Sequence, residues 1–234
     1  MSILRLFLTP LWRKRRLVQR SLGIIVRSNT FKVDHIMLET LTLPIIILIA
    51  AYLIGSLSSA IILCKVAGLP DPRTQGSGNP GATNVMRFGG KKLAITVLLL
   101  DVVKGIVPVV IATLLGLDIA WIAATAFAAF LGHLYPIFFQ FKGGKGVATA
   151  LGGFLALCPP LAGVILLTWI IVFALTRISS LSAIIAAATA PIYSLWLIDN
   201  TIARGIILIM AIMLVMRHRG NIQRLLAGEE GRSK

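Results

Sequence analysis

Six long apolar runs, separated by short polar breaks, constrain this chain more than any other feature. They span residues 43–66, 93–115, 119–139, 147–175, 180–197 and 201–216. A helix needs about 20 apolar residues to cross the hydrocarbon core of a bilayer, and the first three runs reach that length. Hydrophobic residues make up 57% of the chain and charged residues 13%, about half the charged share of an average soluble domain. We therefore predict an all-α integral membrane protein.

The fourth run is too long for one comfortable span and is interrupted by Pro159 and Pro160. Two successive prolines remove two backbone donors, so we predict two helices there, about 147–157 and 160–176, the first of them short. With that split, the breaks on one face, together with Lys65 at the end of the first run, carry thirteen Lys and Arg residues, and the breaks on the other carry only Arg204. Because cytoplasmic loops are enriched in Lys and Arg, we predict seven transmembrane helices, an outside N-terminus and a cytoplasmic C-terminus.

The net charge of +15 does not indicate nucleic-acid binding. Nucleic-acid binders spread their basic residues over a polar face, whereas the basic residues here crowd into short breaks, where they fix topology or meet anions. The two cysteines, Cys64 and Cys158, lie in apolar stretches and are expected to be packing residues. We predict no metal site, no cofactor and no nucleic-acid partner.

The polar segment 73–87 is the first candidate site. Three of its glycines spell G-x-G-x-x-G, but a predicted membrane helix precedes them instead of a β-strand, so a dinucleotide site is not indicated. Glycines allow consecutive backbone N–H groups to converge on an anion, and small polar side chains add donors. We favour an anion-binding loop over a simple polar turn. Its candidate residues are Arg73, Gly76, Ser77, Gly78, Asn79, Gly81, Thr83, Asn84 and Arg87.

The second candidate segment, 142–146, opens directly into the helix predicted from 147. Two lysines and three glycines at the start of a helix place positive charge and free N–H groups where the helix dipole favours an anion. The segment is not a Walker A loop, because a glycine replaces the Ser or Thr that should follow Gly-Lys. Two topology-setting lysines with flexible glycines are an equally good interpretation of this segment alone. Its residues are Lys142, Gly143, Gly144, Lys145 and Gly146.

Three further polar features lie near helix ends or inside a helix. His218 and Asn221 are three residues apart and would share a helix face, unless the segment is a solvated tail. His133 precedes the second segment and is either a base or, as we favour, a structural hydrogen-bonding group. Asp101 and Lys104 lie inside the second apolar run, where unpaired charge is costly. We expect these two to form a buried pair that shapes the site, in preference to direct chemistry.

Four stretches of sequence carry a family resemblance: GSLSSAIILCKVAG, QGSGNPGATNVMR, GHLYPIFFQFKGGKGVATALG and RHRGNIQRLLAGEE. In this order and spacing they resemble the three cytoplasmic blocks of the acyl-phosphate:glycerol-3-phosphate acyltransferases, the PlsY family. The resemblance covers about residues 43–230. It implies seven membrane helices in a bacterial inner membrane, with the active site facing the cytoplasm.

The resemblance also implies the reaction. The family acylates glycerol-3-phosphate from acyl phosphate, giving lysophosphatidic acid and phosphate, the first acylation step of phospholipid synthesis, without acyl-CoA, acyl carrier protein, metal or an obligate protein partner. It implies catalytic roles for Ser77, Asn79, Lys145, His218 and Asn221, and substrate binding by the remaining candidates, including His133. The H-x4-D motif of another acyltransferase class is absent, because Thr40, Phe138 and Gln223 stand five residues after the three histidines. An anion transporter is less consistent, because we find no internal repeat, and a structural scaffold leaves the glycine segments without a role.

The first 36 residues do not fit this scheme. They hold eight Lys and Arg residues and one acid, Asp34. With an outside N-terminus, these eight basic residues would have to cross the membrane, against the usual enrichment of Lys and Arg on the cytoplasmic side. The resemblance begins only near residue 43, and a signal peptide fits poorly. We therefore predict that 1–36 are a misassigned start or a dispensable extension, and that 37–234 form a single acyltransferase domain beginning at Met37. The alternative is a basic arm, helical around 6–25, on a membrane surface.

Overall fold

The structure is a computed structural model that describes residues 41–231. Residues 46–234 form one compact unit, and the elements from α2 onward all lie in its described part. The preceding unit, 1–45, contributes to the described residues only the first turn of a helix, Leu41–Gly55. The predicted dispensable segment 1–36 lies outside the described residues, so the start at Met37 stays a prediction.

All the regular elements in 41–231 are helices, which confirms the all-α prediction. After the helix Leu41–Gly55 they are α2 (Ser59–Val66), α3 (Ala82–Leu114), α4 (Ile119–Leu134), the 3-10 turn η1 (Ile137–Phe139), α5 (Val147–Leu157), α6 (Pro159–Thr176), α7 (Ser179–Leu197), α8 (Thr201–Arg217) and α9 (Arg219–Leu226).

Four helical segments within 41–231 are individually long and apolar enough to cross a membrane: α3, α4 together with η1, α6 and α7. Two further candidates are bent pairs. The helix Leu41–Gly55 joins α2 at 42°, and α8 joins α9 at 56°. α5 is apolar but shorter. The integral membrane character is thus clear, while the count of seven spans and the orientation of the termini remain predictions.

The break predicted at Pro159 and Pro160 is confirmed. α5 ends at Leu157, Cys158 is extended with φ −154° and ψ 92°, and α6 begins at Pro159. Prolines suit the first positions of a helix, because the N–H groups that they lack would have no intrahelical partner there. The two prolines therefore end one helix and start the next.

α3 begins earlier than the apolar run predicted. It starts at Ala82, inside the polar segment 73–87, and its helical path is interrupted at Gly90, which has φ 82° and ψ 171°. Hydrophobic periodicity could not detect these first turns, because they are polar. As a result, Asn84 and Arg87 lie on a helix and not on a flexible loop.

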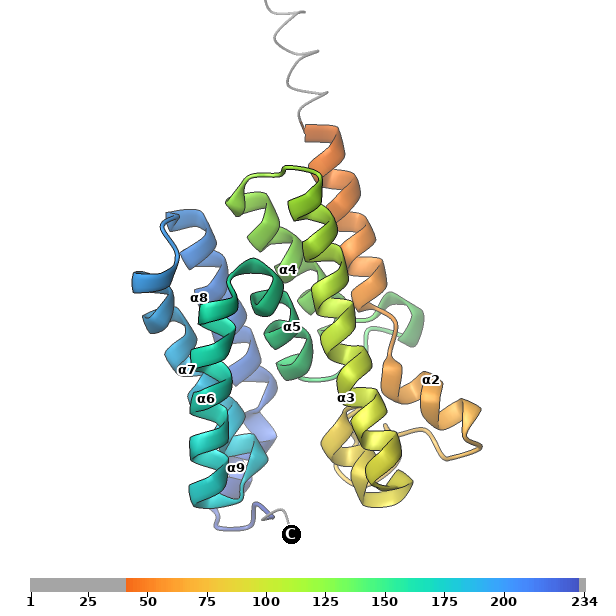
Figure 1. Cartoon of the computed structure of the whole chain (residues 1–234). Coiled ribbons are helices and arrows are strands. Elements are labelled where there is room, and N and C mark those ends of the chain that lie inside the picture. Colours follow the sequence, from red (N-terminus) through yellow and green to blue (C-terminus); the bar gives the residue numbers. More distant parts are fainter. Residues whose placement is uncertain (1–40, 232–234) are drawn as a thin grey trace, which may run out of the picture. The chain divides into compact units, whose positions relative to one another are not determined.

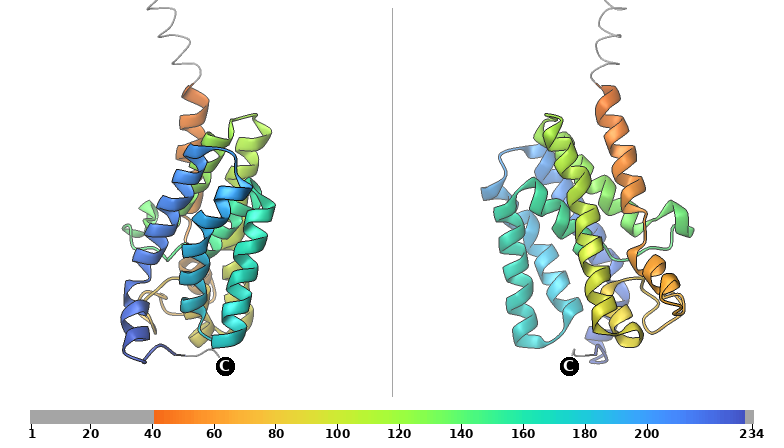
Figure 2. Two further views of the ribbon diagram at one scale, coloured as in Figure 1. Left: turned by 90° about the vertical axis from the view of Figure 1, so that its left-hand side faces the viewer. Right: turned by 45° about the vertical axis from the view of Figure 1, so that its right-hand side comes forward.

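Within the compact unit, α5 contacts α3 and α4 on one side and α6 on the other (Figure 1). α6, α7 and α8 run side by side as a second group (Figure 2). α3 and α5 approach closely at two glycines: a Cβ on Gly105 would lie 2.2 Å from the Thr149 carbonyl oxygen, and one on Gly152 would lie 2.1 Å from that of Val102. Small residues at such contacts are typical of helix packing in membranes.

The length of α5 determines how far along α6 its first turn lies. Its 11 residues span about 16 Å, roughly half the thickness of a hydrocarbon core. Its last residue adjoins the start of α6, and Figure 1 shows it beside the upper half of α6. The glycine- and lysine-rich segment 142–146 therefore begins α5 partway along α6 and not level with the far end of α6.

Candidate functional site

A chain of hydrogen bonds links the start of α5 to the C-terminal end of the described chain. The Lys145 ammonium donates to Asn221 Oδ1, and Asn221 Nδ2 donates to Glu230 Oε1. Ser180 Oγ also donates to Glu230 Oε1 at 2.6 Å, and Arg224 Nε donates to Glu230 Oε2 at 2.6 Å. We call these five residues the Lys145 array. It draws donors from α7, α9 and the segment before α5 to one place.

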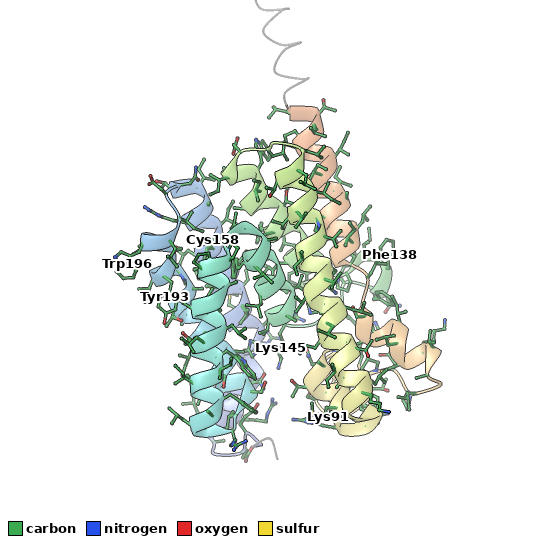
Figure 3. All side chains as sticks on the ribbon, in the orientation of Figure 1. Lys91, Phe138, Lys145, Cys158, Tyr193 and Trp196 are labelled. Atoms are coloured by element: carbon green, nitrogen blue, oxygen red, sulfur yellow. The ribbon has the colours of Figure 1, made fainter. Side chains whose placement is uncertain are left out.

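Burial and neighbouring charges control the protonation of Lys145. Burial lowers the pKa of its ammonium to about 8, and the carboxylate of Glu230 opposes this shift. Arg224, Arg217 and Arg87 lower the pKa further, because each is a like charge nearby. Figure 3 shows Lys145 between α3 and α6. Such a concentration of positive charge is what an anionic group would bind.

Glu230 is the single acid of the array. Burial would raise the pKa of its carboxyl, but hydrogen bonds from Ser180, Asn221 and Arg224 outweigh burial and lower the pKa. Glu230 is therefore a carboxylate that fixes the Asn221 amide, with its oxygen toward Lys145. Ser180, Arg224 and Glu230 were not among the predicted site residues. Glu230 and Arg224 lay in a quoted motif, whereas nothing in the sequence distinguished Ser180.

His218 and Arg217 stand where α8 meets α9. His218 is 2% exposed, and its Nδ1 lies 2.8 Å from the Leu214 carbonyl oxygen. Because a carbonyl only accepts, Nδ1 carries a proton, and Nε2 is the nitrogen left for a ligand. Arg217 donates to the carbonyls of Gly143 at 2.8 Å and Gly144 at 3.1 Å, so it holds the segment before Lys145. This role of Arg217 was not predicted.

The glycines of segment 142–146 are close-packed. A Cβ on Gly143 would lie 2.1 Å from the His133 carbonyl oxygen, and one on Gly144 would lie 2.2 Å from His133 Nε2. Gly146 has φ +87°, and a Cβ there would lie 2.3 Å from the ring of Phe130. These positions leave no space for a Cβ, so glycine is needed for the close packing of the segment. Lys142 is exposed and lies outside the Lys145 array.

Two predicted anion donors of segment 73–87 make hydrogen bonds within the protein. Asn84 is 2% exposed; its Oδ1 accepts from the Ser77 N–H at 2.9 Å, and its Nδ2 donates to the carbonyls of Pro72 and Gln75, each at 2.9 Å. Both hydrogens of the Asn84 side-chain amide thus form hydrogen bonds to backbone carbonyls of the loop. Arg73 binds Asp71 through two nitrogens. These two residues hold the loop in shape, a role that residue type alone does not separate from ligand binding.

Other residues of the same segment are exposed or partly exposed to solvent. Gly76 and Gly78 have positive φ values of 53° and 68°, which turn the loop and leave its backbone exposed. Ser77 and Thr83 are exposed, and Asn79 and Gly81 are partly exposed. Arg87 is exposed as well, yet it is near enough to Lys145 to affect its pKa. The first segment and the Lys145 array therefore share one electrostatic environment.

The predicted pair inside α3 is confirmed. Lys104 Nζ lies 2.9 Å from Asp101 Oδ1, and both side chains are buried. His133 is also buried and lies beside this pair. In the described residues 41–231 no group of three or more His, Cys, Asp or Glu residues is placed to hold a metal ion.

Comparison with known proteins shows the family. The family model described as glycerol-3-phosphate acyltransferase matches residues 45–228. The chain is 55% identical over 186 residues to the glycerol-3-phosphate acyltransferase of Thioalkalivibrio sulfidiphilus, covering 79% of this chain and 91% of that one. It is 57% identical over 183 residues to that of Methylococcus capsulatus, covering 78% and 92%.

Solved structures agree with this result. The glycerol 3-phosphate form of PlsY (YgiH), described as an integral membrane glycerol 3-phosphate acyltransferase, matches with a TM-score of 0.78 and 39% identity, over 82% of this chain and 96% of that one. The lysophosphatidic acid form matches with a TM-score of 0.76 and 38% identity, over 82% and 95%. The chain is an integral membrane member of the glycerol-3-phosphate acyltransferase family.

Proposed function

We propose that this protein transfers an acyl group from acyl phosphate to glycerol-3-phosphate, giving lysophosphatidic acid and inorganic phosphate, the first acylation step of phospholipid synthesis. The observation that carries the proposal is the Lys145 array, in which a partly buried ammonium and an oriented amide meet beside three arginines. Two phosphate groups, one on each substrate, require such a concentration of donors. The solved relatives that carry glycerol 3-phosphate and lysophosphatidic acid support the choice of acceptor and product.

The proposed step is a single acyl transfer. A hydroxyl oxygen of glycerol-3-phosphate bonds to the acyl carbonyl carbon, the bond from that carbon to the phosphate oxygen breaks, and the hydroxyl proton passes to phosphate. Acyl phosphate is a mixed anhydride with a good leaving group, so a covalent acyl-enzyme is not required. Positioning of the two substrates and stabilisation of phosphate charge supply most of the rate.

Each residue of the site has its own role in binding the two substrates. Lys145 and Arg87 neutralise phosphate charge, and the exposed or partly exposed side chains of Ser77, Asn79 and Thr83 donate hydrogen bonds to a phosphate. His218 contributes Nε2, and Asn221 contributes its oriented amide. His133 is not the base, because its ring is packed against Gly144. We assign the base to a phosphate oxygen of the substrates themselves.

The depth of the site suits both substrates. Glycerol-3-phosphate is water-soluble, whereas the acyl chain of the donor partitions into the bilayer. A site at the start of the half-length helix α5 lets a phosphate enter from the basic face while the acyl chain stays among membrane helices. We propose that this face is cytoplasmic and that the membrane is the bacterial inner membrane, because Lys and Arg concentrate on it.

The test uses purified protein in detergent with glycerol-3-phosphate and either acyl phosphate or acyl-CoA. We expect lysophosphatidic acid from acyl phosphate alone, with acyl-CoA inert. Asn221→Ala should lower kcat/KM at least about tenfold, which is about 1.4 kcal/mol of transition-state stabilisation. Asn200→Ala is the matched control. The Asn200 side chain caps the start of α8 by accepting from the Ala203 N–H, and it is not part of the Lys145 array. Comparable rates from acyl-CoA, or an unaffected Asn221→Ala variant, would contradict the proposal.

A further inference from the structure

The buried ion pair of α3 has partners on every side. Asp101 and Lys104 are 3% and 7% exposed. Ser59 Oγ donates to Asp101 Oδ1 at 2.9 Å, and Lys104 Nζ donates to the Leu57 carbonyl oxygen at 2.9 Å. Burying two charges inside a membrane helix is costly and rarely adds stability over apolar residues of the same size. A role in the site is therefore the better explanation for their presence.

His133 connects this pair to the start of α5. Its Nδ1 lies 3.6 Å from Asp101 Oδ1 and 3.2 Å from Thr149 Oγ1, and the side chain is 8% exposed. Asp101 belongs to α3, His133 to α4 and Thr149 to the first turn of α5. The Nδ1 atom of His133 on α4 therefore lies between Asp101 of α3 and Thr149 of α5.

The other side of His133 supports the residue before Lys145. Its carbonyl oxygen accepts from the Gly144 N–H at 3.1 Å, and its Nε2 faces Gly144 so closely that a Cβ there would lie only 2.2 Å away. The ring therefore lies between the buried pair and the Gly144 backbone, with no room for a substrate. Lys145 follows immediately in the chain and donates to Asn221.

We propose that the Asp101–Lys104 pair, acting through His133, positions the Gly144–Lys145 backbone so that the Lys145 ammonium is directed at the bound phosphate. This proposal rests on the proposed function of the Lys145 site. A lysine has a long and flexible side chain, and glycines on both sides of it would leave its backbone free to move. Holding the backbone from behind removes that freedom before the substrates bind, and a misplacement of about 1 Å can cost about a hundredfold in rate.

The test is a double-mutant cycle. Asp101→Asn with Lys104→Met removes both charges together, so neither is left unpaired, and it keeps side chains of similar size. If the pair acts through Lys145, this change should lower kcat/KM at least about tenfold, and it should cost less than about twofold more in a protein that already carries Lys145→Ala. Additive losses, or a wild-type kcat/KM, would overturn the proposal.

A second variant covers the case in which the first does not fold. Thr149→Val removes the hydrogen bond to His133 while keeping the shape, and it should also be non-additive with Lys145→Ala. Thr168→Val is the matched control, because it breaks a comparable 3.0 Å bond to Tyr193 between α6 and α7. The control should keep the wild-type kcat/KM.

Failure of the positioning proposal and failure of the proposed function give different results. If the wild-type protein transfers no acyl group to glycerol-3-phosphate in the assay, the proposed function is refuted. In that case the variants of the same cycle are compared by their affinity for inorganic phosphate, measured by calorimetry on the detergent-solubilised proteins. Non-additive weakening of phosphate binding supports positioning of Lys145, and additive or absent weakening overturns it.

Discussion

The lowered pKa of Lys145 predicts an unusual pH dependence, which replacement by arginine should abolish. Lys145 can neutralise phosphate only when protonated, and burial lowers its pKa to about 8. Activity in kcat/KM, which reports the free enzyme, should therefore decline as pH rises through about 8. In Lys145→Arg the guanidinium stays charged at every accessible pH, so this decline should disappear.

The magnitude follows from the titration of one group. With a pKa of about 8, Lys145 is about nine-tenths protonated at pH 7 and about one-tenth protonated at pH 9, so kcat/KM should fall about tenfold over this interval. Phosphate monoesters have a second pKa near 6, so the charge of glycerol-3-phosphate is almost constant over the same interval. Bound phosphate raises the pKa of Lys145, so kcat should decline at a higher pH than kcat/KM.

The assay measures phosphate release from acyl phosphate between pH 6.5 and about 9.5, with an enzyme-free series subtracted for spontaneous hydrolysis. Lys145→Arg should have lower activity at pH 7, because a broad planar fork replaces a compact head in a segment walled by glycines. Its profile should nevertheless be flat to about pH 9.5. If wild type and Lys145→Arg decline in parallel, the titrating group is not Lys145. If the arginine variant retains full activity at pH 7, Lys145 supplies only long-range charge.

Two further predictions follow from the geometry and one from the sequence. Ser77→Ala and Asn79→Ala should each lower kcat/KM at least about tenfold in the same assay, and wild-type rates in both would remove the loop from the site. Gly152→Ala should lower the thermal unfolding temperature in detergent, because its Cβ would lie 2.1 Å from a backbone oxygen, whereas Gly163→Ala, which meets nothing within 4 Å, should not. Deletion of 1–36 should leave the specific activity intact, and a loss of activity would show that the segment is required.

Sequence reasoning predicted the fold well where the determining effects are local. The break between α5 and α6 follows from the backbone chemistry of Pro159 and Pro160, and the membrane character follows from apolar length. The early start of α3 was missed, because its first turns are polar and carry no apolar periodicity.

The candidate site was predicted less completely, because function there depends on tertiary partners. Lys145 and Asn221 were both selected, and the structure joins them. Asn84 was selected as a ligand-binding residue, but its amide holds the loop. Residue type and position cannot distinguish these two roles, since both require a polar amide in a glycine-rich segment. Ser180 was missed because its relation to Glu230 exists only once α7 and the C-terminal segment pack together.

The fate of the oxygen atom that bridges carbonyl carbon and phosphorus tests the central claim most directly. Acyl phosphate with an oxygen-18 label at that position would be turned over by purified wild-type protein with glycerol-3-phosphate, and both products analysed by mass spectrometry. Acyl transfer predicts one phosphate released for each lysophosphatidic acid formed, with all the label in phosphate and none in the ester. Label retained on the acyl product, or phosphate released without lysophosphatidic acid, would contradict the account.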